Sequence, residues 1–144
     1  MPAISTIASL TKLDLFGSRL TDFGVRFLRK LAALAHIEIC GGGLTDNGVA
    51  TLASLPAIRN LNVSQNGGIT DEGVALLANL PVLEALNLSN TSVGVGALPS
   101  LQRITSLTSL ALYSTTVPPS LSPSLKASLP RLITLGMDGA AAAV

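Results

Sequence analysis

The chain has 144 residues, of which 48% are hydrophobic and 12% charged, and its formal net charge is +1. It is long enough for one domain with a sizeable core, but no apolar run approaches the roughly 18 residues of a membrane span. Lysine and arginine are scattered along the chain, without the basic stripe that nucleic acids or anionic membranes attract. We therefore expect neither a nucleic-acid partner nor a membrane partner.

The start of the chain and its cysteine content bear on the compartment. Residues 1–16 lack the basic region and the sustained apolar region of a secretory signal. Cys40 is the only cysteine, so no internal disulfide can form, which favours a reducing compartment. Both features predict a cytoplasmic protein, with the nucleus as the alternative.

Repeats begin every 24 or 25 residues along the chain. A fixed period of this length is the signature of a solenoid. The predicted single domain, residues 1–144, divides into a partial repeat 1–9, repeats 10–33, 34–57, 58–82, 83–106 and 107–131, and a truncated repeat 132–144.

The five full repeats and the truncated last one all open with the pattern L-x-x-L-x-L, in which Ile, Val or Met can replace Leu. The last two apolar residues alternate with other residues, and this period of two predicts a strand that is buried on one face. The pairs are Leu13/Leu15, Ile37/Ile39, Leu61/Val63, Leu86/Leu88, Leu110/Leu112 and Leu135/Met137.

A second motif, L/I-T-D-x-G-V, follows the strand at residues 20–25, 44–49 and 69–74. Its Thr and Asp are predicted to cap a helix N-terminus, because their side-chain oxygens accept the free N–H groups of the first turn. Apolar residues then recur at helical spacing. Pro56 and Pro81 are expected to end two of these short helices.

The pattern weakens in the last repeats. Residues 91–96 read Thr-Ser-Val-Gly-Val-Gly in place of T-D-x-G-V. Repeat 107–131 contains Pro118, Pro119 and Pro123, so its segment after the strand is predicted to be a loop with at most one helical turn. Because a strand and a short helix cannot bury their apolar side alone, the units are expected to stack.

The six L-x-x-L-x-L units resemble the leucine-rich-repeat family over nearly the whole chain. The resemblance implies an α/β leucine-rich-repeat solenoid, with a curved parallel sheet on the concave side and short helices and loops on the convex side. Of the asparagines usual after the strand only Asn66 is present, so the sequence does not support a continuous asparagine ladder.

Shorter segments resemble narrower groups within this family. The T-D-x-G-V motif is similar to the subclass found in F-box/leucine-rich-repeat proteins and related intracellular proteins. Four further segments resemble an intracellular leucine-rich-repeat protein of plants and green algae. They are LDLFG (13–17), EICGGGLTDNGV (38–49), LNVSQN (61–66) and LNLSN (86–90).

His36, Glu38 and Cys40 alternate on one predicted strand, which raises the question of a Cys/His nucleophile. Residues four apart on a strand are separated by about 13 Å, so Cys40 cannot reach His36. One His and one Cys are too few for a metal site, and the glycines 41–43 lack a complete phosphate-binding motif. We predict no catalytic residue, cofactor or metal, and keep an enzyme or small-ligand site here as an alternative.

The outward strand positions are the predicted partner-binding surface. With strands about 4.8 Å apart, six of them give a concave face about 24 Å across, wide enough for a helix or loop of a protein partner. The predicted function is a non-enzymatic protein–protein interaction module. The resemblance suggests an alternative, the substrate-recognition part of an F-box ubiquitin ligase. The predicted contact residues are Lys12, Asp14, Phe16, His36, Glu38, Cys40, Asn60, Asn62, Ser64, Gln65, Asn87, Asn90 and Tyr113.

The two ends of the array carry apolar residues that a neighbouring repeat would cover. They are Ile4 and Ile7 at one end and Leu132, Leu135 and Met137 at the other. An uncovered strand edge also recruits another strand. We therefore expect the chain to be part of a longer array and, when isolated, to self-associate end to end.

Overall fold

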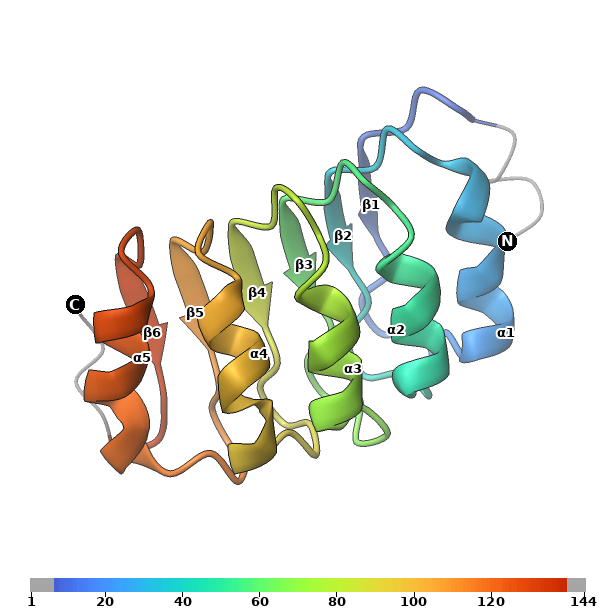
Figure 1. Cartoon of the computed structure of the whole chain (residues 1–144). Coiled ribbons are helices and arrows are strands. Elements are labelled where there is room, and N and C mark those ends of the chain that lie inside the picture. Colours follow the sequence, from blue (N-terminus) through green and yellow to red (C-terminus); the bar gives the residue numbers. More distant parts are fainter. Residues whose placement is uncertain (1–6, 140–144) are drawn as a thin grey trace.

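Six parallel strands form one sheet in the computed structural model, which describes residues 7–139. The strands lie in chain order, and each one pairs with the next (Figure 1). They are β1 (Lys12–Asp14), β2 (His36–Glu38), β3 (Asn60–Asn62), β4 (Ala85–Asn87), β5 (Ser109–Ala111) and β6 (Thr134–Gly136).

The strands pair in the register that the repeat alignment predicts. Their central residues form one row across the sheet, and none of these residues is more than 9% exposed. The residues on either side of this row are exposed or half-buried, as the period of two predicts. The row consists of Leu13, Ile37, Leu61, Leu86, Leu110 and Leu135.

Short helices cover one face of the open sheet (Figure 1). Leucine, valine and isoleucine side chains from both layers form a buried cluster, so each unit buries its apolar side against its neighbours. The helices are α1 (Asp22–Val25), α2 (Asp46–Leu52), α3 (Asp71–Leu77), α4 (Leu98–Arg103) and α5 (Ser122–Ser128), with 3₁₀ turns η2 (Arg26–Lys30), η3 (Val95–Ala97) and η4 (Pro119–Leu121).

The prolines of the fifth repeat begin helices. Pro119 lies in the first turn of η4 and Pro123 in the first turn of α5. At such positions the N–H group has no partner in the helix, and the φ that proline imposes suits the helix. α5 has 7 residues, as many as α2 and α3. The prediction of a loop after the fifth strand is therefore wrong.

In Figure 1, α5 lies in front of β6, and Leu125 of α5 belongs to the same buried cluster as Leu132, Leu135 and Met137. Leu132, Leu135 and Met137 are only 7%, 0% and 2% exposed, so the prediction that they are exposed at the end of the array is wrong. Ile7 is 48% exposed, as expected, and Ile4 lies outside the described residues.

Two threonines of the T-D-x-G-V motif cap their helices as predicted. The side chains of Thr45 and Thr70 each accept the N–H of the residue two positions on, Asn47 or Glu72, at 3.3 Å. Thr21 makes no such bond. The capping prediction is thus confirmed for α2 and α3 and wrong for α1.

The aspartates of the motif bind the next repeat, in contrast to their predicted role as caps. The Asp22 carboxylate accepts the N–H of Thr45 at 2.9 Å and its hydroxyl at 2.6 Å. Asp46 accepts the same two groups of Thr70 at the same distances. Each aspartate therefore fixes the start of the following helix from outside its own repeat.

The motif glycines leave space for these aspartates. A Cβ atom on Gly48 would collide with Oδ1 of Asp22, and a Cβ atom on Gly73 would collide with Oδ1 of Asp46. The T-D-x-G-V motif therefore specifies how consecutive repeats stack.

Asn66 joins the turns of two repeats. It is fully buried, and its Nδ2 donates to the carbonyl oxygen of Ile39, in the preceding repeat, at 2.8 Å. Its Oδ1 accepts the N–H groups of Gly42 and Leu44, both at 3.1 Å. The threonines at the equivalent places donate only to a carbonyl within their own repeat, so this asparagine contact is not continued along the array.

Candidate functional site

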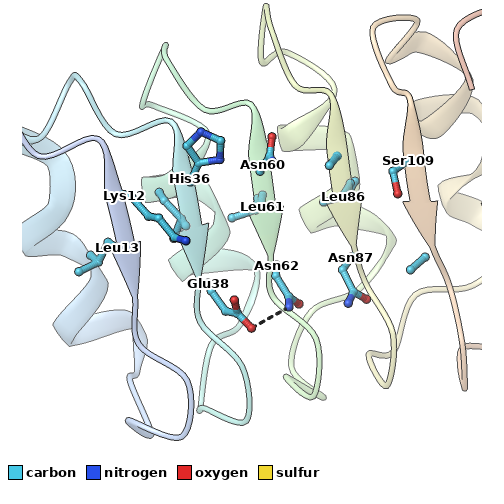
Figure 2. Close-up of a pocket in the computed structure, with 13 residues that line it drawn as sticks. Lys12, Leu13, His36, Glu38, Asn60, Leu61, Asn62, Leu86, Asn87 and Ser109 are labelled. Carbon is cyan, nitrogen blue, oxygen red and sulfur yellow. Dashed lines mark hydrogen bonds between the residues drawn. The ribbon is translucent and has the colours of Figure 1, made fainter. Parts of the chain in front are cut away.

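A hollow of about 350 Å³ lies on the outward face of the sheet, across β1 to β5 (Figure 2). Central strand residues such as Leu61 and Leu86 form its floor, and the residues on either side of them line it. We call this surface the strand face. It consists of two rows: Lys12, His36, Asn60, Ala85 and Ser109, and Asp14, Glu38, Asn62, Asn87 and Ala111.

The chemistry of the strand face changes along the array. The charged and titratable side chains come from β1 and β2, the asparagines from β3 and β4, and small side chains from β5. Figure 2 shows this sequence of side chains from Lys12 to Ser109. A partner would therefore meet a different chemistry at each end of the hollow.

Two of the predicted contact residues bind each other. Nδ2 of Asn62 donates to Oε1 of Glu38 at 3.2 Å, the dashed line of Figure 2. Oδ1 of Asn62 accepts the N–H of Ser64 at 3.2 Å, and Asn87 accepts the N–H of Ser89 in the same way at 3.0 Å. The two asparagines thus hold the turns that end their strands while they also face the hollow.

Lys12, His36 and Asn60 have polar groups that are free to bind a partner. All three side chains are exposed, and within residues 7–139 they make no hydrogen bond or ion pair. They are the first residues of β1, β2 and β3 and belong to the same row of the strand face (Figure 2).

Cys40 and Ser64 are buried, which contradicts their prediction as contact residues. They are 2% and 7% exposed, and the Ser64 hydroxyl donates to the Cys40 sulfur at 3.4 Å. The strands end two residues earlier, at Glu38 and Asn62, so the alternation that would turn these side chains outward has already ended.

Burial raises the pKa of the Cys40 thiol. The carboxylates of Glu38 and Asp14 act in the same direction, because they disfavour a second negative charge, while the hydrogen bond from Ser64 acts against them. A cysteine nucleophile needs the opposite shift, toward the thiolate. The surroundings of Cys40 therefore do not favour nucleophilic chemistry.

The third residue after the end of each strand adopts a left-handed backbone conformation. Glycine takes this conformation without steric cost, whereas Gln65 and Asn90 hold it at a cost of roughly 1–2 kcal/mol each. Both side chains are exposed beyond the ends of their strands. The sequence signal for this position was the glycine at three of the six equivalent places, Gly17, Gly41 and Gly139. The six residues, with φ between 53° and 70°, are Gly17, Gly41, Gln65, Asn90, Ser114 and Gly139.

The two predicted aromatic contact residues are exposed but do not line the hollow. Phe16 is 68% exposed and Tyr113 is 42% exposed. The ring of Tyr113 lies against the backbone of β6, since a Cβ atom on Gly136 would meet ring atoms at 2.5 and 2.8 Å. Tyr113 therefore lies beside the end of the hollow that is lined by small residues. Gly136 makes room for its ring, a contact that the sequence did not reveal.

Residues 7–139 contain no group of three His, Cys, Asp or Glu side chains that could hold a metal ion. In the same part of the chain, no helix has the length and apolar character to cross a membrane.

A family model described as "Leucine Rich repeat" matches residues 56–78. The structure is similar to that of internalin C2 from Listeria monocytogenes, with a TM-score of 0.79 and 23% identity over 95% of this chain and 55% of that one. An internalin (inlF) from the same species is similar at a TM-score of 0.80 and 25% identity, over 98% of this chain and 38% of that one. No curated protein matches the chain at a significant level.

A plant peptide hormone receptor, RGFR1, solved in complex with RGF2, is similar at a TM-score of 0.58 and 15% identity. The similarity covers 94% of this chain and 26% of the receptor. The chain therefore spans little more than half of internalin C2 and less of the other two proteins. With the six-stranded sheet, these similarities confirm the predicted α/β leucine-rich-repeat solenoid.

Proposed function

We propose that the strand face binds a protein partner and that the chain is a non-enzymatic interaction module. The observation that carries this proposal is the hollow of about 350 Å³, which is lined by polar side chains and by the small apolar side chains of Ala85 and Ala111. Lys12, His36 and Asn60 stand along it without partners in the described part of the chain. Apolar area next to free polar groups is the composition of a protein interface.

The strand face suits a segment of a partner that lies across the strands. From β1 to β5 the distance is about 19 Å at about 4.8 Å per strand, and hydrogen-bonding side chains occur along most of it. Cys40 and Ser64 are left out of the proposed contact residues because they are buried. The others are Lys12, Asp14, Phe16, His36, Glu38, Asn60, Asn62, Gln65, Asn87, Asn90 and Tyr113.

Asn60→Arg tests the proposal, because Asn60 is exposed at the middle of the hollow and its replacement adds bulk and charge without entering the core. Ala75→Arg is the matched control, since Ala75 is exposed on α3, among the helices that cover the other side of the sheet. In pull-downs from a lysate of the source organism, the wild type and Ala75→Arg should capture the same partner, and Asn60→Arg should lose it. Equal capture by all three proteins, with equal urea midpoints, would contradict binding at the strand face.

Substrate recognition in an F-box ubiquitin ligase is an alternative that the T-D-x-G-V resemblance suggests. In the structure, however, the Thr, Asp and Gly of this motif make contacts between repeats, and these contacts explain the motif without a ligase. Co-purification of the partner-bound chain with ubiquitin-ligase subunits would favour this alternative.

An enzyme or small-ligand site around His36, Glu38 and Cys40 is the less favoured alternative. Burial raises the pKa of the Cys40 thiol, which leaves less thiolate for nucleophilic attack at neutral pH. A buried, unpaired thiol also suits a reducing compartment, and we propose the cytoplasm or the nucleus as the place where the chain acts.

A further inference from the structure

The first repeat carries a basic and aromatic surface on its helical side. Phe23 is 62% exposed, the three basic side chains near it are exposed, and Phe27 is half-buried. We call this surface the first-helix patch. It lies on α1 and η2, across the sheet from the strand face (Figure 1), and consists of Phe23, Arg26, Phe27, Arg29 and Lys30.

Arg26 stacks on the aromatic rings of the patch. Its guanidinium carbon lies 3.7 Å from the ring centroid of Phe23 and 5.5 Å from that of Phe27. The two rings meet edge to face, with centroids 5.9 Å apart and an interplanar angle of 78°. A guanidinium held flat on a ring keeps its N–H edge available for a carboxylate.

The cations of the patch have no directly paired carboxylate within residues 7–139. Arg26, Arg29 and Lys30 form no ion pair there. Both carboxylate oxygens of the neighbouring Asp22 are already hydrogen-bonded to Thr45. Lysine and arginine are scattered over the chain as a whole, but these three cations lie within five residues of each other.

The patch is not required for the repeats to stack. The equivalent residues of the next two repeats occupy the same places on α2 and α3 and the turns that follow them, and none of them is basic or aromatic. They are Asn47, Ala50, Thr51, Ala53 and Ser54 in one repeat and Glu72, Ala75, Leu76, Ala78 and Asn79 in the other.

We propose that the first-helix patch binds an acidic segment of a protein, whose carboxylates pair with Arg26, Arg29 and Lys30 while an apolar side chain contacts Phe23. Charge-assisted bonds from arginine to carboxylates are strong and directional. A nucleic acid or a membrane fits less well, because base stacking and insertion into lipid use open ring faces, and Arg26 covers a face of Phe23. This surface is separate from the strand face, so the proposal does not depend on the proposed function.

The test replaces the patch by residues that the fold already accepts. The triple variant Phe23→Asn, Arg26→Ala and Lys30→Ser introduces the residues that the second repeat has at these places. The control variant, Arg103→Ser with Arg131→Ser, removes the same amount of positive charge at exposed positions elsewhere. Circular dichroism and urea melts establish that both variants are folded.

The probe is a fluorescein-labelled peptide of Asp, Glu and Leu, and its binding is measured by fluorescence anisotropy. We expect binding to the wild type and to the control variant, weakened by salt, and binding to the patch variant that is weaker on the order of tenfold, or about 1.4 kcal/mol. Equal losses in both variants would assign the binding to net charge and overturn the proposal. Absence of peptide binding, or stronger binding to phosphatidylserine vesicles or to a single-stranded oligonucleotide, would also overturn it.

Discussion

Asp46 stands at the start of α2, but its carboxylate binds the N–H and the hydroxyl of Thr70 in the next repeat. Hydrogen bonds to a charged group contribute about 1.5–3 kcal/mol. We therefore expect Asp46→Ala to lower the free energy of unfolding by about 2–3 kcal/mol in urea melts. The control Glu72→Ala removes an exposed carboxylate from the first turn of α3, and its cost should stay below about 1 kcal/mol.

Gly73 tests the same contact from the other side. A Gly to Ala change inside a helix ordinarily stabilises by about 1 kcal/mol, but here the new Cβ atom would collide with the Asp46 carboxylate. We expect Gly73→Ala to destabilise the chain by about 1–3 kcal/mol. In the Asp46→Ala background this penalty should largely disappear. A double-mutant cycle without coupling would show that the glycine is not there to accommodate the aspartate.

Cys40 should make stability depend on pH in the alkaline range. Burial, followed by the charges of Glu38 and Asp14, raises the pKa of the folded thiol above its ordinary value of 9.0. The folded state therefore holds the proton more tightly than the unfolded state, so the contribution is complete below that value and is lost as the pH rises through the folded pKa. Urea midpoints of the wild type should fall in this range, and Cys40→Ala should lack this part of the fall.

The helix α5 distinguishes the structure from the loop that the prolines suggested. Ala127 lies inside α5 and is exposed, so Ala127→Pro should break the helix at a cost of roughly 3 kcal/mol. Pro123→Ala changes only the first turn and should cost about 0.4–1 kcal/mol, through the freedom that it returns to the unfolded chain. Equally small losses in urea melts would indicate that the segment is a loop in solution.

The array as a whole ends in two strands, β1 and β6, each paired with one strand in the described part of the chain. Self-association through these edges stays a prediction, because an open edge can pair with another strand. Ile133, directly before β6, is an apolar side chain that is 67% exposed at this last edge. Light scattering on the isolated chain should show oligomers that Ile133→Lys reduces. A monomer at tens of micromolar would rule out this association.

The rows of the strand face were predictable because alternation along a strand is a local property. Lys12, His36 and Asn60 face outward for this reason alone. Cys40 and Ser64 continue the same alternation in the sequence, yet they are buried. The point at which each strand ends depends on turn hydrogen bonds and left-handed residues, and periodicity does not contain this information.

The repeat period, the inward leucines and the solenoid fold were determined by the sequence alone, since each follows from spacing within a unit of 24 or 25 residues. The tertiary structure alone decided the contacts between units. It placed Asp46 on Thr70, gave Gly73 the role of leaving space for Asp46, and buried Leu135 in one cluster with Leu125 of α5. The contacts of Asp46 with Thr70 and with Gly73 join residues about one repeat apart. A motif reading treats each unit separately, so only stacking the units reveals which side chain meets which.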